Sequence, residues 1–336
     1  MSQKSNILLI YTGGTIGMIK AKNGQLVPFN FNQLLKEIPE IKRLNVNISV
    51  NSLKQPIDSS NMNPKVWKEL GDIIYKNYTK YDGFVVLHGS DTMAFTASAL
   101  SFMFQNLSKP IILTGSQLPI NMLRTDGKEN LITAIEIAAM TSKIKEVAIY
   151  FEYNLYRGNR TSKINTEDFE AFNSYNYPYL AEIGVNIKIN EKALLKPKKQ
   201  ELIYSNKFSP NVAVLKIFPG ISEAFFKQVL STPNLKGLVL ETFGAGNAPK
   251  QAWVYNSLSK SIKNGLTILN VSQCLAGSVE QTKYETGKHL AKAGTIDCKD
   301  MTFEAAICKL MFAIENFNNQ AKIKKFITSN ISGEIS

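Results

Sequence analysis

The amino-acid sequence predicts a two-domain α/β protein: a larger N-terminal domain with a doubly wound, mainly parallel sheet, and a smaller C-terminal α/β domain. The chain has 336 residues, which exceeds the size at which a single hydrophobic core usually stops growing. Short β-branched runs alternate with longer amphipathic stretches, as they do in βαβ units. The alternation lapses once, in a lysine-rich segment punctuated by proline. We therefore predict one domain at 1–190, a linker at 191–211 and a second domain at 212–336.

In the first domain, short apolar runs that end in polar or glycine-containing segments predict strands. These strands are expected at 7–11, 47–53, 84–89, 110–115 and 146–151. Between them, apolar residues recur at helical spacing, most clearly at 92–107 and 130–142. Strands that alternate with helices in this way pair in parallel, because each helix carries the chain back across the sheet.

The second domain repeats this alternation on a smaller scale. Apolar runs at 212–220, 237–249 and 267–274 begin the expected strands. Helical patterns lie at 222–231 and 302–317. The sequence therefore predicts a second sheet with its own covering helices.

Composition and charge weigh against several classes of protein. The formal net charge is +12, but only four of the 39 basic residues are arginine, and no basic run is interleaved with aromatic residues, so we expect no nucleic-acid partner. The three cysteines lack the spacing of a disulfide framework or a zinc site. We find no secretory signal and no membrane-spanning apolar run, which predicts a cytoplasmic protein without a membrane partner.

The stretch IYTGGTIGM, from Ile10 to Met18, places glycines and hydroxyl side chains directly after the first strand. The dinucleotide-binding fingerprint has the spacing G-x-G-x-x-G, whereas Gly13, Gly14 and Gly17 give G-G-x-x-G. Hydroxyls flanked by glycines can still bind an anion at a helix N-terminus. The stretch by itself is therefore compatible with a phosphate site or with Thr15 presented as a nucleophile.

The HGSDTM motif after the third strand also has two interpretations. Ser90, Asp91 and Thr92 place two hydroxyls and a carboxylate where a helix begins, and these are the residue types that cap helices. His88, which precedes them, can be a packed hydrogen-bonding residue or a catalyst. The chain has two histidines, so a Ser-His-Asp triad or a multi-histidine metal centre is hard to build.

Lysine is the alternative group that can assist a hydroxyl nucleophile. Lys163 lies in YRGNRTSK, an irregular polar stretch after the fifth strand. On spacing alone the sequence favours the interpretation of Lys163 as one more surface lysine.

Taken together, the motifs TGGTIGM, DSS, HGSDTM, TGSQLP, LYRGNRTSK and GAGNAP resemble those of the bacterial-type L-asparaginase family, in particular its cytoplasmic type I branch. The resemblance runs from about residue 6 to the C-terminus. It implies hydrolysis of the side-chain amide of L-asparagine to L-aspartate and ammonia, through a threonine nucleophile and a covalent acyl-enzyme. It also implies that no metal or organic cofactor takes part.

Carried over residue by residue, the resemblance assigns the nucleophile to Thr15 and a proton-relay pair to Ser90 and Lys163. Asp91 is expected to accept the substrate's α-ammonium group and to hold Lys163. The implied substrate-binding residues, besides Ser90 and Asp91, are Gly14, Asp58, Ser59, Ser60, Ser116 and Asn247. Ser59 is expected to take the α-carboxylate.

The sequence departs from the family pattern at three places. Ser90 stands where threonine is more usual, which keeps the hydroxyl. The loop at Ile19–Phe31 has Gln25 near the position of the tyrosine that many members use, so we assign that role to Tyr284 from the second domain. Glu241 replaces an arginine of the site through which asparagine activates some type I enzymes, and we expect weak or absent activation.

Three other functions remain open on the sequence alone: a glutaminase-type amidohydrolase, the asparaginase-like subunit of a tRNA-dependent amidotransferase, and a non-catalytic amino-acid sensor. The amidotransferase subunits carry an extra N-terminal domain, whereas this chain begins at its catalytic strand. A sensor is expected to have lost Thr15 or Lys163, and both are present. Family active sites lie between two subunits, which implies a homo-oligomer, either a dimer or a tetramer built as a dimer of dimers.

Overall fold

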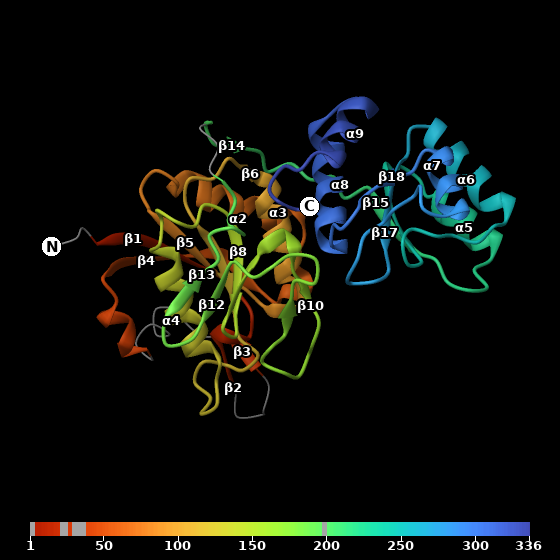
Figure 1. Cartoon of the computed structure of the whole chain (residues 1–336). Coiled ribbons are helices and arrows are strands. Elements are labelled where there is room, and N and C mark those ends of the chain that lie inside the picture. The colour runs from red at the N-terminus through yellow and green to blue at the C-terminus, as the bar shows by residue number, and fades with distance from the viewer. Residues whose placement is uncertain (1–3, 21–25, 29–37, 197–199) are drawn as a thin grey trace. The chain divides into compact units, whose positions relative to one another are not determined.

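The computed structural model describes residues 4–20, 26–28, 38–196 and 200–336 (Figure 1). The chain divides into two compact units, Met1–Asn206 and Lys207–Ser336. In the described part of the chain, every helix falls short of the length and apolar character needed to cross a membrane.

The first unit is built on an eight-stranded sheet in the order β13-β12-β9-β8-β7-β5-β1-β4. Its parallel strands are β1 (Ser5–Gly13), β4 (Val46–Ile57), β5 (Gly83–Leu87), β7 (Ile111–Thr114) and β8 (Val147–Phe151). The strands β9 (Asn154–Arg157), β12 (Ala181–Ile183) and β13 (Ile187–Ile189) extend it in antiparallel fashion. The β5 and β8 strands are buried along their whole length, as expected for strands covered on both faces.

Helices cover both faces of this sheet (Figure 1). The helices α2 (Pro64–Asn77) and α3 (Met93–Met103) pack against each other, and α4 (Gly127–Ala138) packs on β5, β7 and β8. Asn63 caps α2, because its side chain accepts hydrogen bonds from the first backbone N–H groups of the helix. Nearly every residue of α3 is buried, which explains why its sequence is apolar on all sides.

Three two-stranded pairs and several 3-10 turns complete the first unit. The pairs are β2 (Met18–Lys20) with β3 (Leu26–Pro28), β6 (Phe104–Gln105) with β14 (Ile203–Tyr204), and β10 (Ser162–Lys163) with β11 (Phe172–Asn173). The 3-10 turns are η1 (Thr15–Gly17), η3 (Pro39–Arg43), η4 (Ser59–Asn61), η5 (Ser90–Thr92) and η6 (Gly158–Arg160). The β14 strand belongs to this unit, so part of the expected linker at 191–211 contributes a strand. The boundaries of the two domains and of the linker stay a prediction.

The second unit has a parallel four-stranded sheet in the order β15-β16-β17-β18. These strands are β15 (Val212–Lys216), β16 (Gly237–Thr242), β17 (Thr267–Ser272) and β18 (Ile296–Asp297). One face carries α5 (Glu223–Leu230), α6 (Ala252–Lys263) and α7 (Glu285–Ala293), and the other carries α8 (Phe303–Asn316) and α9 (Gln320–Thr328) (Figure 1). The predicted two-domain α/β class is therefore confirmed.

The order of the strands locates the ligand-binding edge of the first unit. The β1 strand lies between β4 and β5, so the chain passes from β1 to one side and then crosses to the other. In open parallel sheets, ligands bind beyond the carboxyl ends of the strands at such a switch point. The segments that leave β1, β4 and β5 at this edge carry Thr15, Ser59 and Ser90.

Candidate active site

The glycine pair after β1 permits a close approach between three segments. Gly13 and Gly14 have φ angles of 122° and 87°, which favour glycine. A Cβ atom on Gly13 would lie 1.9 Å from the carbonyl oxygen of Ile57, and one on Gly14 would lie 2.4 Å from the backbone nitrogen of Gly89. The ends of β4 and β5 therefore close directly on the backbone that precedes Thr15.

Thr15 begins the η1 turn and is half-buried. The two residues that follow it, Ile16 and Gly17, are buried and anchor the turn. The Tyr11 hydroxyl donates a hydrogen bond to the Gly17 carbonyl at 3.2 Å, and burial raises the pKa of Tyr11 to about 12. Tyr11 therefore supports the turn from the core as a neutral phenol, and Thr15 is held on a short, fixed turn.

The segment after β4 carries the DSS motif. Asp58 caps the η4 turn by accepting a hydrogen bond from the Ser60 backbone at 2.9 Å. Ser59 is buried, and its hydroxyl would lie 2.5 Å from a Cβ atom on Gly89. Glycine at position 89 therefore lets the Ser59 hydroxyl approach the backbone that leads to Ser90.

Lys163 reaches the HGSDTM segment from 72 residues away in the sequence. Its Nζ atom donates hydrogen bonds to Ser90 Oγ at 2.8 Å and to Asp91 Oδ1 at 2.6 Å. The Lys163 side chain is 15% exposed and that of Asp91 is 63% exposed. An ion pair with one partner in solvent contributes at most about 1 kcal/mol to stability. The main effect of the pair is therefore to place an ammonium group beside the Ser90 hydroxyl while leaving the carboxylate accessible to a ligand.

These contacts decide between the two interpretations of Ser90, Asp91 and Thr92. Neither η5 nor α3 has a side-chain capping hydrogen bond at its N-terminus. Ser90 and Asp91 bind Lys163 instead, and the Thr92 hydroxyl donates to the Ser59 carbonyl at 2.8 Å. The helix-capping interpretation is therefore wrong for these side chains.

Buried contacts hold the Lys163 segment against α3. A Cβ atom on Gly158 would lie 2.8 Å from Ala97 Cβ on α3, so only a glycine fits there without displacement. Just before it, the Arg157 guanidinium donates to Glu146 Oε2 at 2.6 Å, and both side chains are buried. The two arginines near Lys163 are structural in this way, since Arg160 is also buried and donates to the Asn176 carbonyl at 2.9 Å.

The TGSQLP segment after β7 contributes a residue that the sequence analysis did not single out. Ser90 Oγ donates to Gln117 Oε1 at 3.3 Å, and Gln117 Nε2 donates to the Asp168 carbonyl at 3.0 Å. Ser116, by contrast, is buried and donates its hydroxyl proton to the Leu118 carbonyl at 2.5 Å. A side-chain amide inside a motif already assigned to the site was the signal that could have identified Gln117.

His88 is fully buried and hydrogen-bonded on both ring nitrogens. Nδ1 lies 2.7 Å from the Gly89 carbonyl and Nε2 lies 2.8 Å from Thr96 Oγ1. A carbonyl only accepts, so Nδ1 carries the proton and Nε2 accepts from Thr96. Burial lowers the pKa of His88 to about 4, so the ring is neutral at pH 7. The packed, hydrogen-bonding interpretation of His88 is the one that the structure supports.

Three residues of the sequence analysis, Asn247, Tyr284 and Glu241, belong to the second unit. Asn247 Oδ1 accepts a hydrogen bond from Thr286 at 2.7 Å, which leaves its Nδ2 group as the end that can donate to a ligand. Tyr284 precedes α7 and is 51% exposed. Glu241 lies on β16, in register with Lys216 of β15. Gln25 lies outside the described residues.

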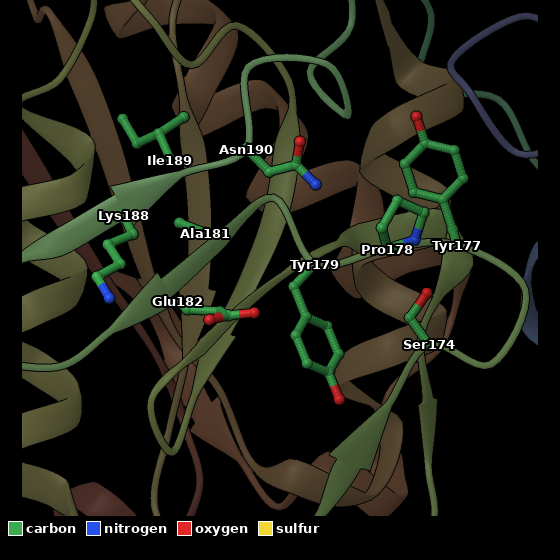
Figure 2. A pocket seen from close by; sticks show the side chains of 9 residues that line it. All are labelled: Ser174, Tyr177, Pro178, Tyr179, Ala181, Glu182, Lys188, Ile189 and Asn190. Carbon is green, nitrogen blue, oxygen red and sulfur yellow. The ribbon is translucent and has the colours of Figure 1, made fainter.

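The first unit therefore brings together Thr15, Ser59, Ser90, Asp91 and Lys163 at the switch point. A separate hollow of about 490 Å³ lies beside β12 and β13 and the segment before them, and it contains none of the predicted site residues (Figure 2). Among the described residues, no group of three or more His, Cys, Asp or Glu side chains is arranged to hold a metal ion.

Both units match known protein families. Residues 6–195 match the model "Asparaginase, N-terminal", and residues 211–327 match "Glutaminase/Asparaginase C-terminal domain". The chain is 39% identical to L-asparaginase 1 of Escherichia coli over 335 residues, covering 99% of this chain and 98% of that protein.

Solved structures of L-asparaginases match as well. The structure of L-asparaginase I from Vibrio cholerae superposes with a TM-score of 0.91 at 38% identity and covers 99% of each chain. The L-asparaginase from Thermococcus kodakarensis superposes with a TM-score of 0.92 at 31% identity, over 98% of this chain and 99% of that one. Together, the fold, the gathered hydroxyl and lysine groups and these matches define an amidohydrolase. The chain belongs to the asparaginase family, as its motifs predict.

Proposed function

We propose that the protein hydrolyses the side-chain amide of L-asparagine to L-aspartate and ammonia, with Thr15 as the nucleophile. The contact of Lys163 Nζ with both Ser90 and Asp91 carries this proposal. Those three groups converge at the switch point, where the glycine-enabled turn presents Thr15. A hydroxyl nucleophile, a second hydroxyl, a lysine and an accessible carboxylate are the groups that cleavage of a small amino-acid amide requires.

The substrate is held by its amino-acid end. Asp91 accepts the α-ammonium group, because its carboxylate is 63% exposed and pairs with Lys163 through one oxygen. Ser59 binds the α-carboxylate, with Asp58 and Ser60 beside it on the η4 turn. Gly14 and Ser116 line the pocket through backbone groups, since the Ser116 hydroxyl donates to Leu118. When the amino-acid end is bound in this way, the side-chain amide of the substrate points toward Thr15.

In the first half of the reaction, Thr15 Oγ attacks the amide carbon and its proton leaves through Ser90. Backbone N–H groups near Thr15 and Ser90 stabilise the oxyanion that develops on the carbonyl oxygen. The C–N bond then breaks, and the nitrogen departs as ammonia after accepting a proton. An aspartyl ester on Thr15 remains. In the second half, water attacks that ester and Thr15 Oγ leaves and regains its proton, which releases aspartate.

Lys163 acts with Ser90 as the proton-relay pair. Its Nζ atom lies 2.8 Å from Ser90 Oγ and 2.6 Å from Asp91 Oδ1. The proton that leaves Thr15 therefore passes by way of the Ser90 hydroxyl to Lys163.

The second unit completes the site in a homo-oligomer, either a dimer or a tetramer made as a dimer of dimers. Asn247 donates a hydrogen bond from its Nδ2 group to the substrate. Tyr284 assists Thr15, in place of the tyrosine that many members carry in the loop at Ile19–Phe31. Exposure of the Tyr284 ring and the free donor end of Asn247 support this assignment. Sedimentation measurements on the active enzyme test it, and a fully active monomer contradicts it.

Two finer proposals concern regulation and location. Because Glu241 reverses a charge, the rate follows a hyperbolic dependence on asparagine concentration, and a clearly sigmoidal curve contradicts this. The protein acts in the cytoplasm, where the thiols of Cys274, Cys298 and Cys308, none of which forms a disulfide, stay reduced. Cell fractionation tests that location.

The deciding experiment measures ammonia release from asparagine and from glutamine by the wild-type protein and by Thr15→Ala. We expect wild-type release from asparagine and loss of it in Thr15→Ala, with an unchanged far-UV circular dichroism spectrum for the variant. Glutamine is longer by one methylene, a difference worth about 1 to 3 kcal/mol in a pocket. Folded wild-type protein that releases ammonia from neither amide contradicts the proposed function.

A further inference from the structure

We propose that Gln117 is a positioning residue that turns the Ser90 hydroxyl into a hydrogen-bond acceptor toward the reacting group. This inference rests on the proposed function and extends it to a side chain with no role in the assignment above. It follows from the direction of three hydrogen bonds, which join Gln117 to Asp168, Ser90 to Gln117 and Lys163 to Ser90.

The orientation of the Gln117 amide is fixed by its far partner. The Asp168 carbonyl lies 3.0 Å from one end of the amide, and a carbonyl can only accept. That end is therefore Nε2. The opposite orientation would place two acceptors against each other. As a result, the oxygen Oε1 faces Ser90, at 3.3 Å from Oγ.

The Ser90 hydroxyl has one proton and two lone pairs to place. Gln117 Oε1 can only accept, so the proton points toward it. Lys163 Nζ donates to the same oxygen at 2.8 Å and occupies one lone pair. The second lone pair is left for an incoming donor, which is the Thr15 hydroxyl in the first half of the reaction and water in the second.

The length of the Ser90–Gln117 bond fits this role. Strong O–H···O bonds have lengths of about 2.7 to 2.8 Å, so a bond of 3.3 Å orients the proton but holds it weakly. Ser90 can therefore give up that contact, so that its own proton passes to Lys163 while its Oγ atom takes the proton of Thr15. Without Gln117, the Ser90 proton is free to point at Thr15 and to compete with the transfer.

The test compares steady-state kinetics on asparagine for the wild type and Gln117→Met, which preserves side-chain length and removes both hydrogen bonds. We expect kcat to fall about tenfold, the effect of one lost hydrogen bond in the transition state, while KM stays within about twofold. We also expect a larger solvent deuterium isotope effect on kcat, because proton transfer becomes slower. Gln117→Leu is a second variant with the same expected result.

Asn165→Ala is the matched control, because Asn165 folds the turn that carries the Asp168 carbonyl but does not contact Ser90. Its side chain accepts from the backbone of Glu167 and Asp168. We expect this variant to keep the kcat and isotope effect of the wild type. If Asn165→Ala reproduces the changes of Gln117→Met, Gln117 acts by anchoring the turn and the inference is wrong.

The two levels of the proposal fail in different ways. A wild type that releases no ammonia contradicts the proposed function. An active wild type whose folded Gln117→Met and Gln117→Leu variants keep kcat within twofold overturns the role of Gln117 alone. A fall in kcat without a change in the isotope effect also overturns it, since a structural defect lowers the rate without exposing the proton transfer.

Discussion

The Thr92 hydroxyl donates a hydrogen bond to the backbone carbonyl of Ser59 at 2.8 Å. This bond ties the start of α3 to the η4 turn, two segments that follow different strands of the sheet. Thr92 lies one residue beyond the pair that binds Lys163. In the proposed function, Ser59 binds the α-carboxylate of the substrate and Asp91 binds its α-ammonium group. The hydrogen bond therefore helps to set the distance between these two binding groups.

Thr92→Val keeps the shape of the side chain and removes this bond. We expect KM for asparagine to rise several-fold and kcat to stay within about twofold of the wild type. The reason is that loss of the hydrogen bond weakens substrate binding and leaves the reacting groups in place. Steady-state kinetics measure both constants. Thr92→Ser retains the hydroxyl and is expected to restore KM. Equal KM values for the valine variant and the wild type contradict this coupling.

We expect Gly14→Ala to lower the free energy of unfolding by more than the cost of placing an alanine at its positive φ angle. Gly14 has φ 87°, and its Cβ atom would also collide with Gly89. Gly220 is the matched control, since it has φ 89° with open space around its Cβ position. An alanine at such an angle costs about 1 to 2 kcal/mol, so Gly220→Ala shows the strain alone.

Urea unfolding at pH 7 compares the two glycine variants. We expect Gly14→Ala to lose clearly more unfolding free energy than Gly220→Ala and to lose its activity as well. Equal losses for the two variants contradict the argument that the segments after β1, β4 and β5 are packed in direct contact.

Tyr284→Phe tests whether this tyrosine assists Thr15. Removal of one hydroxyl that acts on the nucleophile is expected to lower kcat at least about a hundredfold, the lower end of the range for proton-transfer groups. Tyr175→Phe is the matched control, because Tyr175 is a similarly exposed tyrosine at 46% and has no assigned role. Full turnover by Tyr284→Phe, with none by Thr15→Ala, contradicts the assignment.

The stability of the protein is expected to depend on pH through His88. Its pKa is lowered by burial from 6.5 to about 4, so between these values the unfolded chain binds more protons than the folded one. The contribution of neutral His88 is therefore fully present above about pH 6.5 and is lost as the pH falls toward 4. Between pH 7 and pH 5 this loss amounts to about 2 kcal/mol.

Other groups also titrate in this range, so the measurement compares two proteins. The raised pKa of Glu152, about 7 through burial and the carboxylates near it, changes stability in the opposite direction over the same interval. Urea unfolding of the wild type and His88→Asn at both pH values cancels this background. We expect the difference between the two proteins to shrink by about 2 kcal/mol at pH 5, and a constant difference contradicts the prediction.

The sequence allowed prediction of those parts of the fold that have strong local periodicity. Strands at 7–11 and 84–89 and the helix at 302–317 were predictable, because buried parallel strands and packed helices need long apolar patterns. The antiparallel strands β12 and β13 were not predicted. Each has three residues, too few for a pattern, and their existence depends on pairing with β9 and with each other.

The candidate site was predictable where motifs follow strands, and less so where partners are distant in the sequence. Ser90 and Asp91 are adjacent, but nothing local shows that Lys163, 72 residues later, contacts them. Only the family resemblance singled out that lysine among many. Gln117 was missed because its role depends on the direction of two hydrogen bonds, which spacing does not encode.

The position of β1 between β4 and β5 has a consequence for how the protein gains activity during folding. This strand pairs Asn6 with Asn47 on one side and Ile7 with Gly83 on the other, and the lysine of the site comes from position 163. Such long-range pairing closes large loops, which makes it slow compared with the formation of helices. During refolding, the helical signal in circular dichroism should therefore recover before ammonia release does. Enzyme turnover thus reports on the long-range contacts, which form last.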